Sequence, residues 1–180
     1  MPMEQRLMVL SLVGLLMIAV VSDLRRHRIP NWLVLLGLVL GLASQAYFAG
    51  ITGLGNGLLG LLVGFVVFLP LYVLGGMAAG DVKLMAMVGS FLAPGAVLWA
   101  AGCSLLAGGL CGFLLVLVRG QLPLTLSRYW LMLRAQAYLA PAPNEVADQP
   151  FPYSVAILLG TLLSLFWQPF KNWQLFGFGL

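Results

Sequence analysis

Apolar runs long enough to cross a lipid bilayer follow one another along almost the whole chain. Hydrophobic residues make up 62% of the sequence and charged residues only 8%, whereas a soluble globular domain carries roughly a quarter charged residues. A spanning helix needs about 20 apolar residues, so the 180 residues accommodate about six spans and little else. The sequence therefore predicts an all-α, polytopic integral membrane protein, with residues 1–180 forming a single membrane-embedded domain.

Charged and turn-forming residues mark the ends of these spans. Pro30 suits the first turn of the second span, where its missing N–H group would be unpaired in any case. The uncharged, glycine-rich stretch 50–57 is expected to be a tight turn, and the fourth span is short. We expect spans at about residues 7–21, 30–49, 58–74, 81–93, 96–118 and 153–169.

The distribution of basic residues predicts the orientation. Arg25, Arg26 and Arg28 follow the first span and place the first loop in the cytoplasm, so the N-terminus lies outside. Alternation then places the longest polar segment, residues 119–150, in the cytoplasm as well. The net charge of +4 is explained by topology and does not indicate nucleic-acid binding, because no basic patch is interleaved with stacking aromatics.

The cytoplasmic segment 119–150 contains an imperfect apolar stripe at helical spacing. The stripe fits a helix lying in the membrane interface and an ordinary connecting helix equally well. It is formed by Leu126, Trp130, Leu133 and Ala137.

Two of the five acidic residues, Asp23 and Asp81, lie at the ends of apolar runs. A carboxylate next to hydrocarbon is costly, so each marks a candidate functional site. The predicted topology brings both to the cytoplasmic face. Two adjacent carboxyls cannot both ionise easily, so one keeps its proton while the other acts as a base on water, as in aspartic proteases. These are the residue types that a catalytic pair requires, so a catalytic pair is one hypothesis for them.

Simpler explanations exist for both aspartates. Asp81 could cap the helix that it begins, and Asp23 could pair with Arg25 or Arg26. The protein would then be a non-catalytic membrane subunit of a larger assembly. A small transporter is less favoured, because coupling sites usually lie at the membrane midplane.

Other chemistries lack the necessary residues. His27 is the only histidine, so neither an intramembrane Ser–His pair nor a zinc site is expected. Cys103 and Cys111 lie eight positions apart in one apolar run and are expected to behave as small hydrophobic residues. We expect no metal and no organic cofactor.

Three segments resemble the type IV prepilin peptidases, which are membrane aspartic proteases with a GxGD motif. The segment of Asp23 followed by Arg28-Ile29-Pro30-Asn31 is similar to the family pattern after the first span. Gly80-Asp81-Val82-Lys83 resembles GxGDxK, and Phe151-Pro152-Tyr153-Ser154-Val155-Ala156 resembles the Pro-Tyr-Gly-x-Ala opening of the last span. The three occur in the family's order and reach from the first span to the last.

This resemblance implies that Asp23 and Asp81 are catalytic. They would cut the cytoplasmic leader from prepilins or pseudopilins at the bacterial inner membrane. Gly80 would give backbone access to the substrate, Lys83 would orient or tune Asp81, and Asn31, with Pro30 before it, would hold the loop beside Asp23.

Two positions depart from the family motifs. Ala78 stands where the first glycine of GxGD is usual, and Ser154 stands where a glycine usually follows Pro-Tyr. Both replacements are small, so we expect activity to survive. The chain also lacks the tetracysteine domain of the larger members that methylate the new pilin terminus. It resembles the short, peptidase-only members that serve Flp/Tad-type pili.

Overall fold

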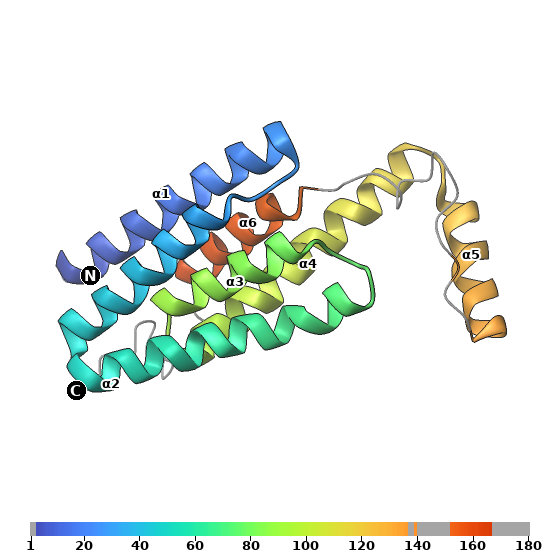
Figure 1. Ribbon diagram of the computed structural model, residues 1–180. Coiled ribbons are helices and arrows are strands. Elements are labelled where there is room, and N and C mark those ends of the chain that lie inside the picture. Colours follow the sequence, from blue (N-terminus) through green and yellow to red (C-terminus); the bar gives the residue numbers. More distant parts are fainter. Residues whose placement is uncertain (1–2, 137–138, 140–151, 167–180) are drawn as a thin grey trace. The chain divides into compact units, whose positions relative to one another are not determined.

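The computed structural model describes residues 3–136, 139 and 152–166, and every regular element in these ranges is an α-helix (Figure 1). The chain divides into two compact units, Met1–Ala107 with Pro152–Leu180 and Gly108–Phe151, which are described separately. In chain order the helices are α1 (Met3–Arg26), α2 (Asn31–Val73), α3 (Ala79–Phe91), α4 (Pro94–Val118), α5 (Leu122–Ala135) and α6 (Tyr153–Phe166).

Length and composition allow three of these helices to cross a membrane, namely α1, α2 and α4. The helix α6 is equally apolar but shorter, and α3 has only 13 residues. An α-helix satisfies its own backbone hydrogen bonds, which lipid cannot do, so this secondary structure suits the apolar composition. The all-α prediction is confirmed for the described residues.

The helix α2 contains the reversal that the sequence predicted as a turn over residues 50–57. Its one non-helical residue is Gly50, with φ 61° and ψ −144°, and the helix resumes directly after it. Figure 1 shows that the chain reverses direction within α2. The expected eight-residue turn is therefore wrong. Gly50 adopts a conformation almost restricted to glycine, and a Cβ at Gly53 would collide with the carbonyl oxygen of Gln45, so glycine there permits the close return.

The short helix α3 is the most buried element of the first unit. Ten of its 13 residues are buried, and it contacts α1, α2 and α6. Glycines permit this packing: a Cβ at Gly60 of α2 would collide with the carbonyl oxygen of Gly89, and one at Gly64 would collide with that of Met85. Small residues that let backbones approach closely are typical of helix contacts in membranes.

A buried side chain closes the far end of α3. Gln45 is fully buried, and its Nε2 donates a hydrogen bond of 3.0 Å to the carbonyl oxygen of Phe91, the last residue of α3. That carbonyl has no partner within its own helix, because the last turn of a helix leaves its carbonyls unpaired. Gln45 thus fixes α3 against α2 at the end away from Asp81.

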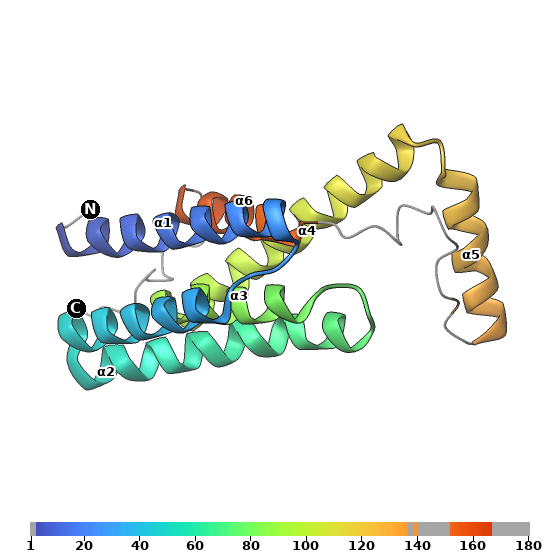
Figure 2. The same cartoon turned by 45° about the horizontal axis from the view of Figure 1, so that its top comes forward.

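The helix ends that carry the predicted site residues lie at one end of the first unit. Figures 1 and 2 both show the end of α1, the start of α3 and the start of α6 at this end. The helix α1 continues to Arg26, so Asp23 lies in its last turn and not in the loop that we expected after residue 21. The N–H of His27 donates a 2.7 Å hydrogen bond to the carbonyl of Asp23 and ends the helix.

The second unit contains the end of α4 and the helix α5. Arg128 lies over the ring of Tyr129 at 5.4 Å, and Arg134 lies over the ring of Trp130 at 5.9 Å. Trp130 and Leu126, two members of the predicted stripe, are exposed. The side chain of Leu133 and the whole of Ala137 lie outside the described residues, so both explanations of the stripe stay open.

Candidate active site

Asp23 lies in the last turn of α1 and is buried, with 8% of its surface exposed. Its Oδ2 accepts a hydrogen bond of 2.6 Å from the hydroxyl of Ser154, which is the second residue of α6 and is fully buried. The bond joins positions 131 residues apart in sequence. It fixes the end of the first helix to the start of α6.

Asp81 lies in the first turn of α3 and is also buried, with 4% exposed. Its Oδ2 accepts a 3.2 Å hydrogen bond from the backbone N–H of Ala78. The backbone N–H of Asp81 in turn donates to the carbonyl of Ala78 at 3.1 Å. This reciprocal pair closes the first turn of α3 and fixes the direction of the Asp81 side chain.

The two carboxyls are close enough to interact electrostatically. Burial of both acids together is unfavourable if both are ionised, which is the condition under which a pair shares one proton. Within the described part of the chain, neither carboxyl has a buried oxygen without a hydrogen-bond partner. In the same ranges no three His, Cys, Asp or Glu side chains gather as metal ligands would.

The predicted positioning residues lie at the start of α2 and in the first turns of α3. Lys83 Nζ donates a 3.1 Å hydrogen bond to Oδ1 of Asn31, and both side chains are exposed. A Cβ at Gly80 would lie 3.5 Å from the side chain of Ile29, an ordinary contact distance. Pro30 precedes the first residue of α2, and its carbonyl accepts hydrogen bonds from that helix's first turn. The segment after α1 thus lies against the start of α3.

A surface hollow of about 530 Å³ adjoins the end of α1. It is lined by Ser22, Arg26, Arg28 and Pro30, and neither aspartate belongs to it. The Ser22 hydroxyl donates a 3.0 Å hydrogen bond to the carbonyl of Arg28, which folds the segment back onto α1.

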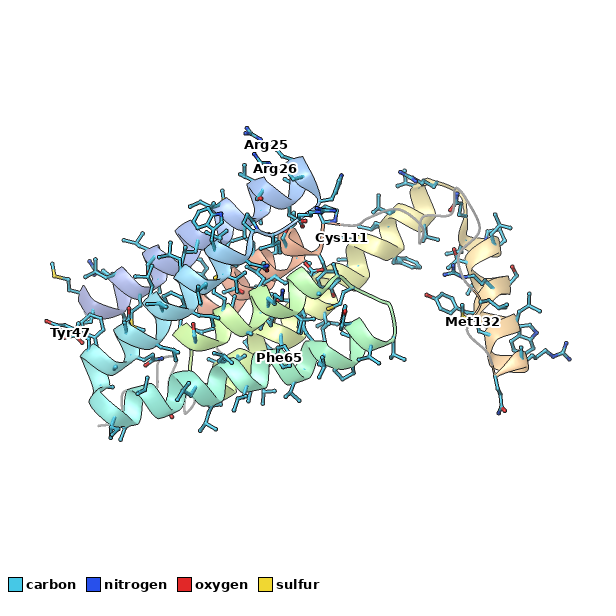
Figure 3. All side chains as sticks on the ribbon, in the orientation of Figure 1. Arg25, Arg26, Tyr47, Phe65, Cys111 and Met132 are labelled. Atoms are coloured by element: carbon cyan, nitrogen blue, oxygen red, sulfur yellow. The ribbon has the colours of Figure 1, made fainter. Side chains whose placement is uncertain are left out.

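Of the two simpler explanations, the structure supports the cap by Asp81 but not the ion pair of Asp23. Asp81 does cap α3, through its bond to the N–H of Ala78. Asp23 is bonded to Ser154, and among the described residues it forms no ion pair with Arg25 or Arg26. Figure 3 shows both arginines at the end of α1, directed away from the helices, where they are exposed. A cap alone does not require a second buried acid beside it.

Ser154 is the site residue whose contact the sequence did not predict. At the sequence level Ser154 is only a small replacement for glycine, with no predicted contact. The feature that could have indicated this contact is the polarity of Ser154. Its hydroxyl stands at the start of an apolar segment, where the Pro-Tyr-Gly-x-Ala motif has a glycine. Phe151, from the same motif, lies outside the described residues.

The described residues form an all-helical protein with one buried acid at the end of α1 and another at the start of α3. The model of the Type IV leader peptidase family matches residues 10–117, more than half of the chain. The chain belongs to this family and is thus a leader-peptidase-type protein, as the motifs predicted. The match includes both aspartates, Asn31 and Lys83, and ends before Ser154. No curated protein and no solved structure has significant similarity to the chain.

Proposed function

We propose that this protein is a membrane aspartic endopeptidase that removes the cytoplasmic leader peptide from prepilins or pseudopilins. Asp23 and Asp81 are its catalytic pair. The observation that carries this proposal is that two buried carboxyls, 8% and 4% exposed, lie at one end of the helical unit, one in the last turn of α1 and one in the first turn of α3. Buried carboxyls from different helices that lie at one end of a bundle are typical of catalytic sites.

The chemistry requires only a water molecule and the two acids. The ionised carboxyl takes a proton from water as the water oxygen attacks the scissile carbonyl carbon, and the protonated carboxyl gives its proton to the carbonyl oxygen. The resulting gem-diol then breaks its C–N bond. The first carboxyl delivers its proton to the leaving nitrogen, and the second regains a proton from a gem-diol hydroxyl. The pair returns to its starting state.

We also propose that the chain crosses the membrane six times, which the lengths of the helices support. The helix α2, with 43 residues, is about twice the length of one span and reverses at Gly50, so it supplies two crossings. The helices α1, α3, α4 and α6 supply the other four. The N-terminus is then outside the bacterial inner membrane, and Asp23 and Asp81 lie at the cytoplasmic face. The segment 119–150 is the cytoplasmic loop of one membrane-embedded domain.

We further propose that the enzyme is a peptidase without N-methyltransferase activity, of the type that serves Flp/Tad-type pili. Both cysteines, Cys103 and Cys111, lie within α4, and they cannot supply the four ligands of a tetracysteine domain. A mature pilin from this enzyme should therefore carry an unmodified N-terminus, which the mass of the product would establish.

The test is leader cleavage of a co-expressed candidate prepilin, read as a gel shift. Wild type is compared with Asp23→Asn and Asp81→Asn, each checked for normal membrane insertion. Glu4→Gln is the matched control, because it makes the same charge change on an exposed residue of α1. We expect loss of cleavage in both aspartate variants and wild-type cleavage in the control. Cleavage by either aspartate variant would reject the pair and favour a non-catalytic assembly subunit.

A further inference from the structure

Ser154 differs from the other buried serines of the first unit in the partner of its hydroxyl. Ser90, Ser104 and Ser164 each donate to a backbone carbonyl three or four residues earlier in their own helix. This is the usual way in which a helical serine is satisfied. Ser154 instead donates across the bundle to the carboxyl of Asp23.

The position of Ser154 explains this choice. As the second residue of α6 it has no preceding helical turn whose carbonyl could accept its hydroxyl. The side chain is fully buried, so water does not compete for the bond. The Ser154–Asp23 distance of 2.6 Å is typical of a hydroxyl that donates to a carboxylate, which is stronger than a neutral hydrogen bond.

The bond constrains the side chain on which the proposed chemistry depends. With Oδ2 of Asp23 held by Ser154, rotation of the carboxyl is restricted, so Oδ1 keeps a defined direction. Asp81 is constrained in a similar way by the N–H of Ala78. The two carboxyls of the proposed pair are thus held by different donors, Asp23 by the hydroxyl of Ser154 and Asp81 by the N–H of Ala78.

We propose that Ser154 is a positioning residue that holds Asp23 in its catalytic orientation, which rests on the proposed function above. It fixes the carboxyl through its hydroxyl and does not itself contact the reacting atoms. The family model covers residues 10–117 and does not include Ser154, so this role is inferred from the hydrogen bond and the contact of α6 with α1. A glycine in its place would leave Asp23 without this donor.

The experiment compares kcat and KM for purified full-length protein in detergent, with a purified prepilin that the wild type cleaves. Ser154→Ala should lower kcat by about tenfold or more, the usual value of a hydrogen bond to a charged group, with KM within about twofold. Ser164→Ala is the matched control, because it removes a buried hydroxyl from the same helix that does not reach Asp23. It should leave kcat within about twofold of wild type.

A second pair of variants separates the hydroxyl from packing. Ser154→Thr and Ser154→Val have nearly the same shape, so any steric cost of the added methyl group is common to both. Only threonine can donate to Asp23, so its kcat should exceed that of the valine variant by about tenfold. Equal kcat values for the two would overturn the proposal, as would an equal loss in Ser154→Ala and Ser164→Ala.

The same assay distinguishes failure of this inference from failure of the proposed function. If Asp23→Asn and Asp81→Asn are inactive while all Ser154 variants cleave like wild type, only the positioning role is wrong. If the aspartate variants cleave normally, the catalytic pair is wrong and the role of Ser154 falls with it.

Discussion

Lys83 in α3 donates a hydrogen bond of 3.1 Å to the side chain of Asn31, the first residue of α2. The bond joins positions 52 residues apart in sequence, and Lys83 follows Asp81 by two residues. It ties the segment that follows Asp23 to the helix that carries Asp81. The two predicted positioning residues therefore act on each other, whereas the sequence had assigned each of them to a different aspartate.

Lys83→Ala and Asn31→Ala should each reduce cleavage about two- to fivefold, and the double variant should be no worse than the poorer single one. Both side chains are exposed, so their bond contributes only about 0.5–1 kcal/mol. A double-mutant cycle on the cleavage rate measures the coupling. Fully additive losses would show that Lys83 and Asn31 act independently. They would favour the alternative that Lys83 acts directly on Asp81.

The parts of the site that could be predicted from sequence are those carried by local patterns. Asp23 and Asp81 stand out because acids are costly in apolar runs, and the structure shows both of them buried at helix ends. The reversal at Gly50 was placed in the correct region but made too long. Glycine content indicates a turn, whereas the number of non-helical residues depends on how closely the two halves of α2 pack.

Contacts between distant segments could not be predicted in the same way. The burial of α3 depends on Gly60 and Gly89 facing each other, and the bond from Ser154 to Asp23 depends on how α6 packs against α1. Nothing in the spacing of these residues along the chain encodes either contact. Both arise from the packing of helices whose apolar surfaces are similar all round.

Asp81→Glu separates the capping role of Asp81 from the proposed catalytic one. Glutamate at the third position of a helix caps the preceding N–H group well, so the start of α3 should survive. The carboxyl, however, moves by about one C–C bond, roughly 1.5 Å, which is enough to misalign a catalytic pair. We expect cleavage to fall at least 100-fold, while the free energy of unfolding falls by no more than about 1–3 kcal/mol, the cost of an extra methylene.

The gel-shift assay and unfolding of the purified protein measure these two effects of Asp81→Glu. Substantial cleavage by this variant would support the capping explanation alone.

Gly80→Ala tests whether the glycine before Asp81 is required for access of the substrate backbone. The added Cβ meets Ile29 at 3.5 Å, an ordinary contact, so the fold should accommodate it. Stability should be unchanged or slightly higher, since alanine favours a helix over glycine by up to about 1 kcal/mol. Cleavage should nevertheless fall about tenfold, because a displacement of about 1 Å can cost up to about 100-fold in rate.

Cleavage kinetics and thermal unfolding on the same preparation provide the test of Gly80→Ala. Wild-type cleavage by a stable variant would show that Gly80 does not serve access.

Gly50→Ala tests whether one residue makes the reversal within α2. Beyond the neighbouring backbone, no atom lies within 4 Å of the added Cβ, so a loss of stability must come from the backbone conformation, φ 61° and ψ −144°. Forcing alanine into this region should cost about 1–3 kcal/mol of unfolding free energy. Gly55→Ala is the matched control: its Cβ also meets nothing, but its backbone is helical, so it should be neutral or stabilising by up to about 1 kcal/mol. Equal stabilities for the two variants, measured by unfolding in detergent, would show that the reversal tolerates a side chain and that α2 turns by a different backbone path.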